Sequence, residues 1–241
     1  MEWVIVLKGN NETDLKLLAR HFNSTDLNIV KENNQFVIKS NYLNFNKIKS
    51  SFECINMAEK LLNIVNGLSK VLLKIENNIW SNLAYLLDEN NNQVQGCSWM
   101  NFSVIMQNKN GLVSDDNNVE LSTNISKYCE KILHNDNFYR AIIFLHYDKD
   151  NWRDLYCVYE VIRDVIGNGN DKSGEKIIKS WLPDKDKNMI NIFTQTANSI
   201  KVVKEQARHG KVFDAPKIKM NLFDAKNLIY KIILIWLENY S

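Results

Sequence analysis

Proline and glycine are scarce in this chain, which has 2 Pro and 8 Gly among its 241 residues. That scarcity excludes a collagenous or linker-like protein. A disordered chain would have few apolar residues and a large net charge. Here apolar residues make up 45% of the chain and the formal net charge is +2. The composition therefore predicts a folded globular protein that buries roughly 70% of its unfolded surface.

Long apolar runs, a targeting signal and clustered cysteines are also missing. No uncharged apolar run reaches the length of about 18 residues that a membrane-spanning helix needs, so we expect no membrane partner. Met1-Glu2-Trp3 carries no basic region before the first apolar stretch, so we expect no secretion signal and a cytoplasmic location. The four cysteines lie at least 28 positions apart. Without a C-x-x-C pair or closely spaced histidines, we expect no metal site, no cofactor and isolated buried thiols.

Several motifs of common enzymes do not occur either. The sequence has no G-x-x-x-x-G-K-[ST], no G-x-S-x-G and no H-E-x-x-H, and its carboxylates show no spacing for a paired-carboxylate reaction. Nucleotide hydrolysis, serine hydrolysis and zinc proteolysis are therefore disfavoured. The small net charge argues against a nonspecific DNA binder, which would carry a basic stripe. We expect no sequence-specific DNA binding, whereas a small site for RNA or a nucleotide remains open.

Arginine is the scarcest charged residue and the most informative one. The chain has five Arg against 25 Lys and 35 Asn, as an AT-rich coding background would produce. Where lysine is the usual cation, a retained arginine more often uses its planar, permanently charged fork, which suits carboxylate or phosphate. The five positions that this reasoning singles out are Arg20, Arg140, Arg153, Arg163 and Arg208.

The first hundred or so residues alternate between strand-like and helix-like patterns. Apolar residues at helical spacing predict helices over 14–22 and 52–73, and β-rich runs predict the strands between and after them. The predicted strands are 3–7, 27–30, 36–38, 79–87 and 94–106, with a hairpin turn at 31–34. Residues 1–110 are thus predicted to form a small α/β module in the order β-α-β-β-α-β-β.

Beyond a polar linker at 108–118, the apolar period becomes helical almost throughout. The predicted helices are 119–134, 138–147, 152–166, 174–181, 187–206 and 222–239. For the last helix, Asn221 is the expected N-cap, with Asp224 three positions on in a capping-box arrangement. The sequence therefore predicts an α+β protein in which the α/β module is followed by an all-α helical bundle over residues 111–241.

The last predicted helix also suggests self-association. Its apolar stripe includes Ile232, Ile233, Ile235 and Trp236, which is wider than a single core-facing seam. An exposed apolar remainder of that size usually marks an interface, so we expect a homodimer through the helical half.

Arg208-His209-Gly210 is the segment that most resembles a site. It follows Thr194 to Ser199, which includes Asn198, and it ends the helix predicted over 187–206. In one interpretation, Arg208 and His209 finish a helix and bond its last carbonyls. In the other, Arg208 holds a phosphate or carboxylate and His209 moves a proton near neutral pH.

Two further pairs are weaker candidates for binding. Arg140 and His146 share one predicted helix, but six positions place them on different faces. Glu160 and Arg163 are three apart and can pair on one face. Glu160 is expected either to belong to a structural ion pair or to reach the Arg208 region and orient it.

The helical half resembles the HEPN superfamily, within a set of uncharacterised bacterial proteins similar to the whole chain. The resemblance rests on 152–163, Thr196-Ala197-Asn198, Ala207-Arg208-His209-Gly210 and the closing helix 225–237, taken in that order, together with the opening residues 3–9. HEPN proteins typically dimerise and bring an Arg, a polar residue and a later His into a shared cleft. Many are metal-independent ribonucleases of defence and toxin systems.

The resemblance implies that Arg208 binds phosphate and that His209 is the polar residue after it. The pattern also calls for a His separated from the Arg by four to six intervening residues, but positions 213–215 are Phe, Asp and Ala. Arg140 and His146 fit that spacing on an earlier helix. We therefore expect a noncatalytic binding or regulatory protein of a bacterial defence or stress system. The alternative is a metal-independent endoribonuclease in which Arg208 stabilises the phosphorane and His209 acts as acid or base.

Overall fold

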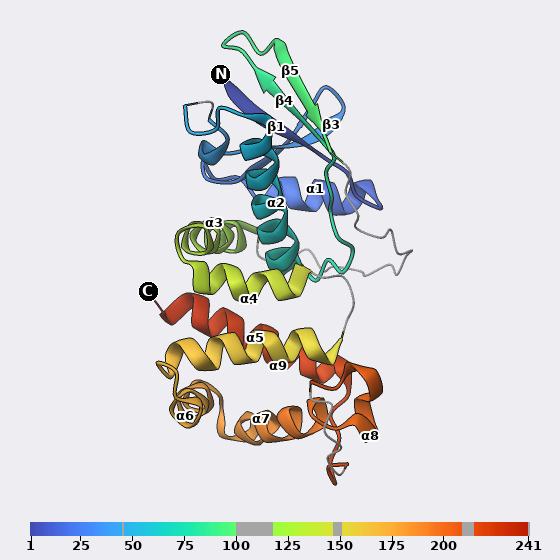
Figure 1. Cartoon of the computed structure of the whole chain (residues 1–241), viewed down its shortest axis with the longest axis vertical. Coiled ribbons are helices and arrows are strands. Elements are labelled where there is room, and N and C mark those ends of the chain that lie inside the picture. Colours follow the sequence, from blue (N-terminus) through green and yellow to red (C-terminus); the bar gives the residue numbers. More distant parts are fainter. Residues whose placement is uncertain (45, 100–117, 147–150, 209–214, 241) are drawn as a thin grey trace. The chain divides into compact units, whose positions relative to one another are not determined.

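The computed structural model describes residues 1–44, 46–99, 118–146, 151–208 and 215–240, without the side chains of 118–123 and 146. The chain divides into two compact units, Met1–His134 and Asn135–Ser241 (Figure 1). The first contains an antiparallel sheet with its helices, and the second is helical in its described part. The predicted α+β class is therefore confirmed at this level. Within the described residues, no helix has the length and apolar character that crossing a membrane would require.

The sheet of the first unit has five strands in the order β2-β3-β1-β4-β5, all paired antiparallel. Their bounds are β1 (Glu2–Leu7), β2 (Asn28–Glu32), β3 (Gln35–Lys39), β4 (Leu83–Leu87) and β5 (Gln93–Ser98). The β2–β3 hairpin turns through Asn33 and Asn34, both with positive φ. This confirms the predicted turn, because asparagine tolerates the left-handed region that tight hairpins need.

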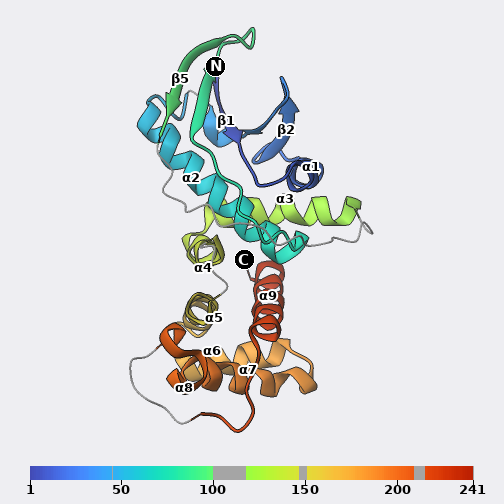
Figure 2. The ribbon, with the colours of Figure 1, turned by 90° about the vertical axis from the view of Figure 1, so that its right-hand side faces the viewer.

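Two helices cover one face of this sheet, as Figure 2 shows for α1 (Glu12–His21) and α2 (Ser51–Leu68). A short 3₁₀ helix, η1 (Asn41–Leu43), precedes α2, and the π-helical turn η2 (Ser69–Leu73) continues it. A complete capping box starts α2: the Ser50 side chain accepts from the Glu53 amide, and the Glu53 carboxylate accepts from the Ser50 amide. The order β-α-β-β-α-β-β is confirmed.

Helix α3 (Asn118–His134) packs on α1 and α2, so it belongs to the first unit. The sequence predicts that the helical domain starts at residue 111, within the polar linker 108–118 that precedes the helical periodicity. The compact unit instead ends at His134, since periodicity reports the type of an element and not the neighbours against which it packs. Most of the predicted linker, 108–118, lies outside the described residues.

The second unit is arranged around α5 (Trp152–Ile166), which packs on helices before and after it in sequence. The other elements are α4 (Asp136–His146), α6 (Asp171–Trp181), α7 (Asp184–Ala197), α8 (Ile200–Val203), the 3₁₀ turn η3 (Lys204–Gln206) and α9 (Leu222–Asn239). An aromatic cluster lies in its core, where Tyr156 and Tyr159 of α5 pack on Phe193 of α7. The predicted N-cap of α9 is confirmed, because the Asn221 side chain accepts from the Asp224 amide.

The helix predicted over 187–206 is wrong as a single element. The structure ends α7 at Ala197, with Asn198 as its C-cap, and resumes with α8 and η3. Asparagine and serine have lower helix propensity than alanine, and Asn198-Ser199 stands at the break. Two predicted strands are also shorter than expected. The strand predicted from residue 79 begins at Leu83, and β5 ends at Ser98, with 100–106 outside the described residues.

The apolar stripe of α9 is largely buried within the chain. Ile232, Ile233 and Trp236 are each at most 1% exposed, and Ile235 is half-buried. The homodimer was expected because this stripe looked wider than the core could cover, and that argument no longer holds. Homodimerisation stays a prediction, which the buried stripe of α9 does not support.

Candidate functional site

A cavity of about 630 Å³ opens in the helical unit. It is walled mainly by α4 and α5, and residues of α6 and of the segment after η3 complete it. The lining comprises Tyr139, Arg140, Ile143 and Phe144 of α4, Cys157, Glu160, Val161, Arg163 and Asp164 of α5, Asp171 of α6, and Arg208. Three of the five arginines of the chain therefore line one cavity.

The turn between α5 and α6 brings Asp171 to this cavity. Asn168 and Gly169 have positive φ and reverse the chain, and the Asn170 side chain then caps α6 by accepting from the Ser173 amide. Helix α6 crosses so close to α5 that a Cβ at Gly174 would lie 2.0 Å from the Arg163 carbonyl oxygen. Glycine is thus required for the approach that places Asp171 beside Arg163.

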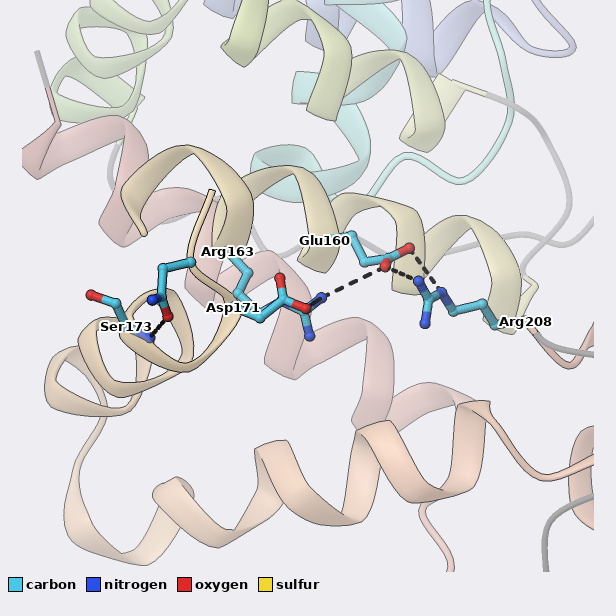
Figure 3. Close-up of polar contacts among 6 residues, drawn as sticks. Glu160, Arg163, Asp171, Ser173 and Arg208 are labelled. Carbon is cyan, nitrogen blue, oxygen red and sulfur yellow. Dashed lines mark hydrogen bonds and ion pairs between the residues drawn. The ribbon is translucent and has the colours of Figure 1, made fainter. Parts of the chain in front are cut away.

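An ion-pair chain runs along the cavity wall (Figure 3). The Arg208 guanidinium donates to both carboxylate oxygens of Glu160, with Nε 3.0 Å from Oε2 and Nη2 on Oε1. Arg163 Nη2 lies 3.7 Å from the same Oε1 and 3.0 Å from Asp171 Oδ2. Two arginines therefore converge on one carboxylate. The two expectations for Glu160 are both met geometrically, since it pairs with Arg163 and also reaches Arg208.

The backbone and an aromatic ring fix the position of Arg208. Its amide donates to the Ala197 carbonyl at the end of α7 (3.2 Å), and its Cζ lies 4.7 Å from the centroid of the Tyr156 ring. Arg163 lies similarly over Tyr159, at 5.4 Å. Both guanidiniums therefore lie over tyrosine rings of the buried core. Cation–π attraction and the ion pairs stabilise each guanidinium in the same position.

Arg140 differs from the other two arginines. It is exposed on α4, and it makes no hydrogen bond or ion pair with the part of the chain that the structure describes. Arg163, by contrast, is mostly buried. Burial by itself would lower the pKa of Arg163, but Asp171 and the other neighbours outweigh it and raise that pKa. Arg163 therefore stays a cation, and Arg140 is the exposed one of the three arginines that line the cavity.

The remaining predicted site residues are distributed differently. Asn198 does not line the cavity; it caps α7 beside Ala197, and its Oδ1 is buried without a partner among the described residues. His146 ends α4, but its side chain is not described. His209 lies outside the described residues. The structure thus brings Glu160, Arg163, Arg140 and Arg208 together, and it does not test either histidine.

The described lining offers little for nucleophilic or metal chemistry. Burial raises the pKa of the Cys157 thiol, with Glu160 and Asp154 adding to the effect, so the reactive thiolate is disfavoured. No histidine stands among the described lining residues. Among the residues that the structure describes, no group of three or more His, Cys, Asp or Glu side chains is arranged to hold a metal ion. The lining instead combines three guanidiniums, of Arg140, Arg163 and Arg208, with three carboxylates, of Glu160, Asp164 and Asp171.

Asp171 is the main site residue that sequence reasoning missed. The predicted helix began at Gly174, which left Asp171 in a loop, whereas α6 begins at Asp171 itself. The signal was available, because Asn170 followed by an acidic first turn is typical of a helix N-terminus. Asp164 and Tyr139 were not identified either, and no pattern in the sequence distinguishes them from surface residues.

In comparisons with protein-family models, curated proteins and solved structures, none matches this chain. The functional argument therefore rests on the cavity itself.

Proposed function

We propose that the helical unit is a noncatalytic binding module whose cavity takes a phosphate group, either of a nucleotide or of an RNA strand. One observation carries the proposal: three arginines line a single cavity in a chain that otherwise uses lysine. Forked guanidiniums bind phosphate oxygens in pairs, and a permanently charged arginine does so at any physiological pH.

The size and lining of the cavity agree with a small ligand. Sites for small molecules commonly enclose roughly 300–1,000 Å³ and combine apolar walls with a few polar groups. Here Ile143, Phe144 and Val161 supply apolar wall, and the arginines supply the charge. A nucleotide has the same combination of a flat apolar base and a charged phosphate.

The resemblance to the HEPN superfamily, which rests on sequence features, is part of this proposal. It likewise implies that Arg208 binds phosphate. The rival function, a metal-independent endoribonuclease, uses Arg208 and His209. Arg208 lines the cavity and His209 follows it in sequence, which is the reason to test cleavage directly. A regulatory role in a defence or stress system likewise stays a proposal.

The test compares two exposed arginines of the helical unit. Wild type, Arg140→Gln and Arg153→Gln are titrated against a single-stranded oligoribonucleotide with a 5′-phosphate and a 3′-fluorophore, in EDTA. Arg153 is the matched control, because it is an exposed arginine of α5 that does not line the cavity. Arg140→Gln should weaken binding about tenfold, the value of one charge-assisted hydrogen bond of about 1.5 kcal/mol, and Arg153→Gln should leave it unchanged.

The same reactions separate the two functions. Intact RNA on a denaturing gel, with binding lost in Arg140→Gln, supports the binding module. Cleavage in EDTA that disappears in His209→Ala, with an unchanged melting temperature, would establish the endoribonuclease instead. If Arg140→Gln and Arg153→Gln lose the same affinity for RNA, the loss reflects only the lower positive charge of the protein. The cavity would then be excluded as the binding site.

A further inference from the structure

The Glu160 carboxylate occupies the place in the cavity where arginine donors converge. Its Oε1 contacts Nη2 of Arg208 and lies 3.7 Å from Nη2 of Arg163, and its Oε2 accepts from Arg208 Nε. A forked pair of N–H groups donating to two oxygens is also the geometry by which arginine binds phosphate. The carboxylate thus stands where a ligand oxyanion would meet two guanidiniums.

The pair between Glu160 and Arg208 is open enough to separate. The side chains are 27% and 29% exposed, and both line the cavity. A carboxylate that turns out of such a position can be hydrated, and partly exposed ion pairs contribute little net stability. Arg163, whose side chain is 12% exposed, keeps Asp171 at 3.0 Å when Glu160 leaves. Departure of Glu160 therefore leaves Arg163 paired with Asp171, and it vacates the positions at which the carboxylate oxygens meet Nε and Nη2 of Arg208.

We infer that Glu160 is an internal competitor of the ligand, which a phosphate group displaces from Arg208 on binding. The inference rests on the proposed function, since it concerns how the same cavity takes its phosphate. It also narrows the ligand class. A phosphodiester carries one negative charge, as the Glu160 carboxylate does, so the exchange does not strengthen the attraction to Arg208. A terminal phosphate carries about −1.5 to −2 charges and is attracted to Arg208 more strongly. The cavity should therefore prefer a terminal phosphomonoester to the internal phosphodiesters of RNA.

Charge-matched variants of the helical unit test the competition. Glu160→Gln and Asp136→Asn each remove one negative charge from this unit. Asp136 is exposed at the start of α4 and does not line the cavity. Adenosine 5′-monophosphate serves as the probe in isothermal titration calorimetry. Glu160→Gln should bind it about fivefold more tightly than wild type, which is about 1 kcal/mol. Asp136→Asn should change affinity less than about twofold, because exposed charges outside the cavity are screened by salt.

A second measurement needs no altered Glu160. In wild type, the Arg208 Nε–Hε signal in a ¹⁵N NMR spectrum should shift on titration with adenosine 5′-monophosphate, and that of Arg153 should not. Arg208→Lys assigns the signal. The preference for terminal phosphate is measured with oligoribonucleotides that carry a 5′-phosphate or a 5′-hydroxyl, and wild type should bind the first more tightly.

The outcomes separate the inference from the proposed function. If wild type binds no phosphate probe, both fail. If wild type binds and Glu160→Gln is unchanged or weaker, the competitor role is refuted, and weaker binding would make Glu160 a positioning residue for Arg208. Equal tightening in Glu160→Gln and Asp136→Asn would reveal only a change in net charge, and it would refute the competitor role. An unshifted Arg208 signal at saturating probe, or equal affinity for the two oligoribonucleotides, would also overturn the inference.

Discussion

Gly174→Ala tests the helix approach on which the cavity wall depends. In an ordinary helix interior this change stabilises by about 1 kcal/mol, because glycine has the greater backbone entropy to lose. At Gly174 the new Cβ would lie 2.0 Å from the Arg163 carbonyl oxygen and 2.9 Å from the Arg163 carbonyl carbon. Both are backbone atoms of α5 and cannot turn aside as a flexible side chain could.

The expected sign is therefore the reverse of the helix propensity. Relieving the clash requires α6 to move away from α5, and overpacking of this kind costs about 1–3 kcal/mol or more. If the clash costs about 3 kcal/mol and the higher helix propensity of alanine returns about 1 kcal/mol, the free energy of unfolding should fall by about 2 kcal/mol. For a chain of this length, that corresponds to a melting temperature lower by about 4–8 °C.

Denaturant unfolding and thermal melts followed by circular dichroism measure the loss. Ser173→Ala is the control, because Ser173 is exposed on the same helix and its amide keeps its bond to the Asn170 side chain. It should be neutral or slightly stabilising. If Gly174→Ala is as stable as wild type, α6 does not approach α5 as described, and the Asp171–Arg163 pair built on that approach is refuted with it.

Two more predictions concern the first unit. Asn66→Ala should destabilise by about 2–4 kcal/mol in denaturant unfolding, because the buried amide bonds both the N–H and the C=O of Ile79, and two buried groups lose their partner. The exposed Asn56→Ala on the same helix should cost nothing, and equal effects would contradict the reasoning. Burial, followed by neighbouring Cys97, raises the pKa of Cys54 to about 12. Because the unfolded thiol ionises near pH 8.5, stability should fall as pH rises above that value, and less so in Cys54→Ala; identical pH profiles would refute the assignment.

Local sequence patterns determined much of the fold. The five strands, the hairpin at Asn33-Asn34 and the Asn221 N-cap were predictable, because alternation, turn preferences and caps act over a few residues. The scarcity of arginine likewise pointed to Arg140, Arg163 and Arg208 before any contact was known. Composition thus identified side chains that the fold then brought together in one cavity.

Only the tertiary structure decided which of these residues meet. Arg208 pairs with Glu160 across 48 positions, and this contact depends on the break after Ala197 and on the return of the chain to α5. Asp171 reaches Arg163 only because α6 crosses α5 at Gly174. Such contacts are set by the packing of helices against one another, and periodicity along a single helix contains no information about its partner.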